Sequence, residues 1–161
     1  MIAMNGVSRI TTADDVALIT IRNETSNPTL IGKIFSEFSG EGIVIDMISQ
    51  TVPQGSTMDI SFTTDSAQVV KVLTVISRIR DQYKQLKIMV STGNCKIQLY
   101  GEEMREMNGV AASAISSLLG DGIDIVMITT SEIDISFIVS PACYLRAVTV
   151  LEKAFSVKAA V

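Results

Sequence analysis

The chain has 161 residues, of which 47% are hydrophobic, with a net charge of −4, few aromatic residues and no histidine. The acidic balance argues against nucleic acid as a partner, and the lack of histidine excludes Ser-His and Cys-His nucleophile pairs and most transition-metal sites, so we expect no catalytic residues, metal or cofactor. No uncharged run approaches the ~18 apolar residues of a membrane span and no signal-peptide pattern opens the chain, which predicts a cytoplasmic protein without a membrane partner. Cys95 and Cys143 are far apart in sequence and are interpreted as reduced thiols.

The first half of the chain predicts the order β-α-β-β-α-β, the ferredoxin-like arrangement. Its β-branched and alternating runs predict strands, and its apolar residues at helical spacing predict helices. In chain order we expect a strand at 16–21, a helix from Pro28 to Gly40, strands at 43–48 and 58–63, a helix opened by Ser66, and a strand at 86–90. Asn27-Pro28 reads as a helix N-cap with proline in the first turn.

The second half predicts the same elements but ends before the last strand. We expect a strand at 96–100, a helix at 110–119, strands at 123–128 and 133–139, and a helix capped by Ser140-Pro141. The remaining residues, 156–161, are a poor candidate for the closing strand. The strand-like segment 6–10 has no role in the first half, so we expect it to fill the open sheet edge of the second.

An internal repeat supports this division. Gly40–Ile48 returns as Gly120–Ile128, and Asp59–Phe62 returns as Asp134–Phe137. A repeat of this length indicates one small domain duplicated. The sequence therefore predicts an α+β fold with two ferredoxin-like (βαββαβ) domains in tandem. We expect the first over residues 15–92 and the second over 93–161 together with the leading residues 4–11.

Residue types point to two turns as candidate binding sites. Residues 26–29 and 106–109 each enter the first helix of a repeat and present backbone N–H groups at its amino end. Such an end attracts a carboxylate, including that of an amino acid. The neighbouring second strands supply side chains for an ammonium group or a polar tail. The alternative is plain helix capping. Asp59 and Asp134 are interpreted as solvent-facing or turn-bonded.

Several segments resemble the two ACT domains of aspartate kinases. The segment 42–50, followed by Met58-Asp59-Ile60-Ser61-Phe62, resembles the first. Gly109-Val110-Ala111-Ala112, with Met127-Ile128-Thr129-Thr130-Ser131-Glu132-Ile133, resembles the second, and the leading Met4-Asn5-Gly6-Val7 resembles the strand that precedes them. The resemblance covers nearly the whole chain.

The resemblance implies a regulatory region without a kinase core. Aspartate kinases phosphorylate aspartate with ATP at the head of lysine, threonine and methionine synthesis, and their ACT pair senses end-product amino acids. This chain is similar in extent to the separate small regulatory subunit of some bacteria, and equally to an excised fragment. The resemblance implies a homodimer through the ACT domains, lysine and/or threonine as effector at that interface, and a kinase catalytic domain or subunit as partner.

Effector contacts are implied at positions from both repeats. They are Ser26, Asn27, Pro28, Thr29, Leu30, Ile31, Asp46, Gln50, Asn108, Gly109, Asp124, Ile125, Ser131 and Glu132.

The chain also departs from the family pattern. Residues 26–29 replace the usual aspartate, lysine, proline and glycine, and Val44 replaces an asparagine, whereas Gln50 is retained. In the second repeat Asn108 replaces a proline and Asp124 an asparagine. The changes in the first repeat weaken a threonine-type pocket in the first domain.

Two other functions stay open: a stand-alone ACT sensor or assembly module with a different ligand, and a small ferredoxin-like enzyme.

Overall fold

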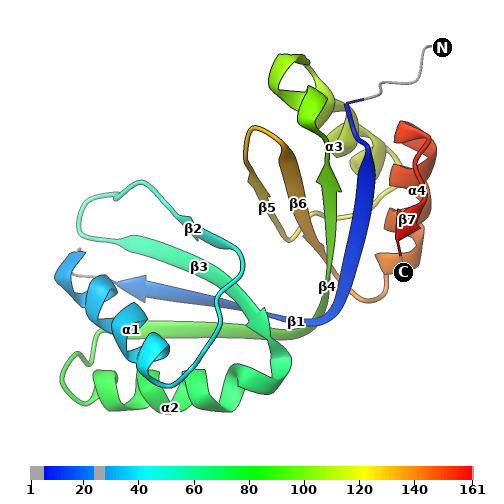
Figure 1. The fold of residues 1–161 in the computed structure, drawn as a ribbon. Coiled ribbons are helices and arrows are strands. Elements are labelled where there is room, and N and C mark those ends of the chain that lie inside the picture. The colour runs from blue at the N-terminus through cyan, green and yellow to red at the C-terminus, as the bar shows by residue number, and fades with distance from the viewer. Residues whose placement is uncertain (1–5, 24–27, 161) are drawn as a thin grey trace. The chain divides into compact units, whose positions relative to one another are not determined.

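The computed structural model describes residues 6–23 and 28–160, which form two compact units (Figure 1). The first unit is Asp15–Thr92. The second is Gly93–Val161 together with the residues before Asp15. Two long strands, β1 (Arg9–Asn23) and β4 (Leu86–Tyr100), contribute to both units. This is why both strands are longer than the sequence predicts: each continues past the end of one unit into the next.

The first unit is a four-stranded sheet with two helices. Its strand order is β2-β3-β1-β4, and β3 pairs antiparallel with β1 from Val16↔Asp65 to Asn23↔Met58. In chain order its elements are the later part of β1, α1 (Pro28–Gly40), β2 (Ile48–Gln50), β3 (Met58–Asp65), the 3-10 turn η1 (Ser66–Gln68), α2 (Val69–Arg80) and the first part of β4. The helix expected from Ser66 thus begins three residues later, after this turn.

The second unit repeats the arrangement. Its strand order is β5-β6-β4-β1-β7, and β6 pairs antiparallel with β4 from Cys95↔Val139 to Tyr100↔Asp134. Its elements are the later part of β4, the 3-10 turn η2 (Glu102–Glu106), α3 (Val110–Gly120), β5 (Met127–Thr130), β6 (Asp134–Val139), α4 (Tyr144–Phe155) and β7 (Ala159–Ala160). The predicted fold class, two ferredoxin-like domains in an α+β protein, is confirmed.

The first part of β1, Arg9–Asp14, is here named the leading strand, and it lies beside β4 in the second unit. The backbone N–H of Ser8 donates to the carbonyl of Tyr100 at 2.8 Å. Val7 and Ile10 are 3% and 0% exposed within the core of this unit. The short tail strand β7 pairs parallel with the outer side of the leading strand, at Ile10↔Ala159.

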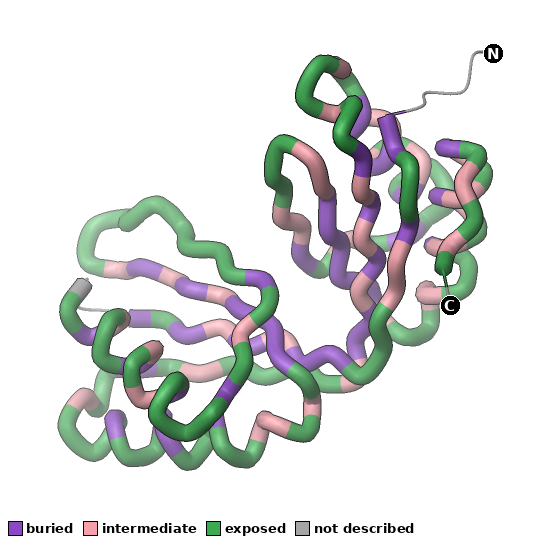
Figure 2. Tube along the Cα trace, viewed as in Figure 1, coloured by how far each residue is buried: buried purple, intermediate pink, exposed green. Residues whose placement is uncertain are grey.

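Each unit has its own apolar core between the helices and one face of the sheet. Buried residues follow the strands and the inner sides of the helices (Figure 2). In the first unit Phe35, Phe38 and Phe62 pack with ring centroids 5.3–5.6 Å apart. Phe137, the counterpart of Phe62 in the repeat, is likewise fully buried. The duplicated segments therefore coincide with the duplicated cores.

The bounds of the strands expected at 43–48 and 123–128 are wrong. The structure forms β2 at Ile48–Gln50 and β5 at Met127–Thr130. The apolar residue at the start of each expected strand instead closes the preceding helix: Ile43 N donates to Phe38 O, and Ile123 N to Leu118 O, both at 3.0 Å. Gly42 and Gly122 make this possible with φ of 70° and 69°, the left-handed geometry of a helix C-terminus.

The unit boundary has a specific backbone signature. β1 passes it at Asp15 with φ of 51°, and β4 passes it at Gly93 with φ of 71°. The left-handed region costs a non-glycine residue roughly 1–2 kcal/mol, and aspartate tolerates it better than most. Both strands that join the units therefore carry a left-handed residue at the crossing.

Among the helices that the structure describes, none is long and apolar enough to cross a membrane.

Candidate functional site

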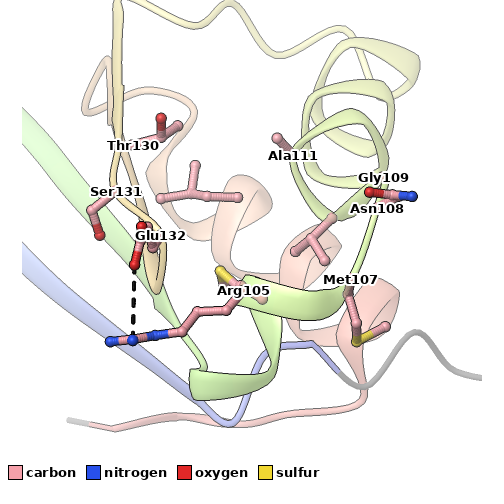
Figure 3. Close-up of a pocket in the computed structure, with 11 residues that line it drawn as sticks. Arg105, Met107, Asn108, Gly109, Ala111, Thr130, Ser131 and Glu132 are labelled. Carbon is pink, nitrogen blue, oxygen red and sulfur yellow. Dashed lines mark ion pairs between the residues drawn. The ribbon is translucent and has the colours of Figure 1, made fainter.

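The second unit has a pocket at the amino end of α3, between η2 and the turn that joins β5 to β6 (Figure 3). Its volume of about 420 Å³ lies within the range of small-molecule sites. The lining residues come from η2, from α3 and its approach, and from the ends of β5 and β6. They are Met104, Arg105, Met107, Asn108, Gly109, Val110, Ala111, Thr130, Ser131, Glu132 and Ile135.

The start of α3 gives one wall of the pocket its electrostatic character. Gly109 occupies the N-cap position with φ of 86°, and no side chain caps the helix there. Glycine adopts this left-handed geometry without strain, which allows the chain to turn sharply from Asn108 into the helix. The first N–H groups of a helix have no partner within the helix, and its dipole makes that end positive. This wall therefore suits a carboxylate.

Opposite charges face each other at the pocket. Arg105 Nη1 and Glu132 Oε2 are 3.8 Å apart, and their side chains are 54% and 80% exposed. Arg105 also lies 3.7 Å from Glu102. Figure 3 shows the guanidinium of Arg105 and the carboxylate of Glu132 on facing sides. Exposed pairs of this kind contribute only ~0–1 kcal/mol, so a ligand with charges of its own can separate them at little cost.

The β5–β6 turn, residues 131–133, places Glu132 at the pocket. Ser131 organises this turn: its hydroxyl accepts hydrogen bonds from the backbone N–H groups of Ile133 and Asp134, each at 3.2 Å, and donates to the Asp134 carboxylate. The N–H of Ser131 donates to the Asp134 carbonyl at 2.9 Å. Asp134 is therefore bonded to the turn, one of the two roles that the sequence leaves open for it.

The structure brings together four of the residues expected at an effector site in the second unit. Asn108, Gly109, Ser131 and Glu132 all line the pocket. The other two lie in the segment before β5: Asp124 is exposed, and Ile125 is partly buried against the core.

Sequence reasoning missed several lining residues. Arg105 is the most important because it supplies the positive charge, yet it belongs to no motif. Met104 and Met107 both pack against the core and also line the pocket. Only its position in the sequence could have pointed to Arg105 as a pocket residue, since it stands just before the turn that leads into α3.

In the first unit the expected residues are more dispersed. Ser26 and Asn27 lie outside the described residues, Pro28 begins α1, and Thr29 is exposed. Leu30 is 2% exposed in the core and Ile31 packs against that core.

Leu30 also borders a pocket of about 370 Å³ lined by Asn23 and residues 82–86, a set that includes neither Asp46 nor Gln50. Both of these residues are exposed, Asp46 bonded through its N–H to the Thr63 carbonyl and Gln50 paired with Ile60.

No cluster of three potential metal-ligating His, Cys, Asp or Glu residues occurs in the part of the chain that the structure describes. Cys95 and Cys143 are free thiols. Burial raises the pKa of the Cys95 thiol, with a smaller contribution from the negative charge of Asp14. This cysteine is therefore held in its protonated, unreactive form.

Comparison with known proteins accounts for this fold. A family model described as the ACT domain matches residues 97–155. Together with the duplicated fold, this match defines the molecule as a tandem pair of ACT domains, a class of regulatory module. An aspartate kinase of Pseudomonas putida is 31% identical over 153 residues, which are 95% of this chain and 37% of that protein. The chain belongs to the aspartate kinase family and corresponds to its regulatory ACT domains.

Solved structures agree with this assignment. A chain in the crystal structure of aspartokinase alpha and beta subunits is 31% identical and superposes with a TM-score of 0.85, covering 94% of this chain and 99% of that chain. The regulatory subunit of aspartate kinase from Thermus flavus has the same fold, with a TM-score of 0.84 at 24% identity, over 93% of this chain and 99% of that chain. The chain spans little more than a third of the length of the curated relatives it matches.

Proposed function

We propose that this chain is the amino-acid-sensing region of an aspartate kinase and exerts feedback control on its catalytic part. The observation that carries the proposal is the pocket at α3, where a positive helix end and Arg105 face Glu132. A free amino acid carries a carboxylate and an ammonium group on one carbon. The carboxylate fits the helix end and Arg105, and the ammonium group fits Glu132.

Regulation follows from differential binding. An amino acid that inserts between Arg105 and Glu132 replaces their direct, weak ion pair with two charge-assisted contacts. It stabilises the arrangement of the ACT domains in which those contacts form, and a kinase domain or subunit that is sensitive to this arrangement changes its activity. In this proposal the working unit is a cytoplasmic homodimer through the ACT domains, with the effector held at their interface.

Lysine and threonine, singly or together, are the proposed effectors. A stand-alone ACT sensor with a different ligand is the second candidate, because Val44, 75% exposed, stands where the family has a polar asparagine. The fourteen positions implied by the family resemblance remain the proposed contacts, to which the structure adds Arg105.

Titration calorimetry with lysine, threonine, methionine and their mixtures tests the function. We expect millimolar or tighter binding of at least one of them to the chain, weakened roughly tenfold by Arg105→Gln or Glu132→Gln, since a hydrogen bond to a charged group contributes about 1.5–3 kcal/mol. Arg78→Gln is the matched control: Arg78 forms an ion pair with Glu41 at 2.6 Å and is 53% exposed, but it belongs to the first unit.

Gln50→Ala reports on the first unit in the same titration. A loss of affinity with Gln50→Ala alone moves the effector to the first unit. Absence of binding by every aspartate-pathway amino acid contradicts the proposed function and favours the second candidate.

A further inference from the structure

The two repeats hold an equivalent aspartate in different ways. Asp59 and Asp134 each lie at the start of the third strand of a unit and pair with the equivalent position of its first strand, Arg22↔Asp59 and Tyr100↔Asp134. In the first unit Arg22 donates to both carboxylate oxygens of Asp59, at 2.8 and 2.9 Å. In the second unit the equivalent residue is Tyr100, whose hydroxyl donates at 2.6 Å to Glu102 instead.

Asp134 is therefore held by neutral donors. The side-chain amide of Gln98 donates to Asp134 Oδ2 at 2.6 Å, and the hydroxyl of Ser131 donates to Oδ1. The Gln98 amide oxygen accepts a longer hydrogen bond, 3.4 Å, from the hydroxyl of Thr11 in the leading strand. Bonds to a carboxylate are about twice as strong as neutral ones, so the Gln98–Asp134 bond is the main link.

These four side chains form a continuous series from the leading strand to the pocket. Thr11 lies on the leading strand, Gln98 on β4 and Asp134 on β6, and Ser131 begins the β5–β6 turn. Both ends of the Gln98 amide are engaged, which fixes its orientation. The same turn carries Glu132, which faces Arg105 across the pocket.

We propose that Gln98 and Asp134 are positioning residues of the α3 pocket: they hold the β5–β6 turn so that Glu132 faces Arg105, and they tie that turn to the leading strand. Neither residue lines the pocket, so they act through Ser131. Beyond the leading strand, β1 continues into the first unit. A ligand that moves the turn therefore also displaces a strand shared by both ACT domains. This inference rests on the proposed function only for the identity of the ligand.

Exchanging donor and acceptor tests the positioning role. Gln98→Glu removes the amide donor and sets two carboxylates against each other. Hydrogen exchange of the chain, followed residue by residue, should then rise roughly tenfold at the Ile133 and Asp134 amides, which are bonded to Ser131, because a hydrogen bond contributes ~0.5–1.5 kcal/mol. Adding Asp134→Asn restores one donor and one acceptor between the two positions, and exchange should return to within about twofold of the original.

Binding of lysine and threonine to the same variants is the second readout. Affinity should fall roughly tenfold in Gln98→Glu and recover in the double variant. Thr20→Val is the matched control, because Thr20 occupies the position equivalent to Gln98 in the first unit and bonds Ser61 at 2.8 Å. It should leave the turn amides and the affinity unchanged.

Unchanged exchange at the turn in Gln98→Glu, or a double variant that recovers nothing, overturns the positioning role. If the unmodified chain binds no amino acid, the proposed function fails, whereas the exchange measurement still decides whether Gln98 and Asp134 hold the turn.

Discussion

Gly101, the residue after β4, should tolerate no side chain. A Cβ atom at Gly101 would overlap the carbonyl oxygen of Gly6 and lie 2.8 Å from the Gly6 carbonyl carbon and 3.2 Å from Val7 Cα. These atoms belong to the backbone and have no rotamer that moves them aside. Gly101→Ala must therefore push the segment 6–10, which includes the start of the leading strand, away from the rest of the second unit.

The cost follows from what this segment buries. Val7 and Ile10 are 3% and 0% exposed, and burial of such side chains contributes ~1.5–3 kcal/mol each. The hydrogen bond from Ser8 to Tyr100 adds about 0.5–1.5 kcal/mol. Complete detachment would thus cost roughly 3.5–7.5 kcal/mol, and a partial shift about 2–4 kcal/mol, a large share of the ~5–15 kcal/mol that stabilises a typical domain.

Urea unfolding followed by circular dichroism measures this loss. Gly120→Ala is the control, because Gly120 ends α3 with no atom within 4 Å of an added Cβ, and we expect a change of no more than about 1 kcal/mol. Gly6→Ala should fall between the two, since its Cβ would meet the side chain of Val110 at 2.8 Å. Equal midpoints for Gly101→Ala and Gly120→Ala would refute the packing argument.

Three further predictions concern charge and backbone. The Arg22 guanidinium lowers the pKa of Asp59, so the pair stabilises the fold above the unfolded carboxyl pKa and loses this effect as pH falls through the folded pKa. Arg22→Met should therefore lower the free energy of unfolding by no more than ~1 kcal/mol at neutral pH and leave it unchanged well below pH ~4, as measured by pH-dependent melting. A difference in stability that stays constant with pH would contradict this. Gly93→Ala should cost roughly 1–2 kcal/mol in urea unfolding from its left-handed φ alone, because no atom crowds the site; an unchanged midpoint would show that the strand can relax. Glu152→Gln should speed amide hydrogen exchange at Ala159 in β7, because the backbone N–H of Ala159 donates to the Glu152 carboxylate at 2.8 Å. Unchanged exchange would show that the pairing with β1 alone holds β7 in place.

Local sequence signals predict most of the fold. The repeat and its apolar periodicity identify four helices and the main strands, because each helix buries one stripe and each strand one face. The leading strand could be expected because the second repeat lacks a closing strand. β7 could not, since two alanines carry no pattern and their pairing depends on the leading strand.

The displaced second strands show where periodicity misleads. Ile43 and Met47 are buried and alternate like strand residues, yet Ile43 completes the end of α1. The N–H of Asp46 donates to the Thr63 carbonyl and the N–H of Thr63 to the Met47 carbonyl, but the N–H of Met47 donates to the side chain of Thr63, at 2.9 Å, so the pairing with β3 is irregular here. An extended segment that pairs irregularly with a neighbouring strand has the same apolar pattern as a regular strand, so only the tertiary hydrogen bonds distinguish the two.

The site is less predictable than the fold for a similar reason. Asn108 and Gly109 follow from helix-end chemistry, and Ser131 and Glu132 from the family resemblance. Arg105 reaches the pocket only because η2 folds back between β4 and α3. The bonds between Thr11, Gln98 and Asp134 join residues 87 and 36 positions apart, and no local pattern encodes them.

The shared strand β1 also sets an order of events during synthesis. The leading strand leaves the ribosome before every element of the protein with which it pairs, and its partner carbonyl at Tyr100 follows Ser8 by 92 positions. The first unit is built from the continuous stretch Asp15–Thr92 and can close as soon as that stretch has emerged. The second unit must wait, with Val7 and Ile10 exposed to water, until β4 is complete. A nascent chain therefore carries an unpaired strand until β4 has emerged, and an unpaired strand edge can pair with other chains.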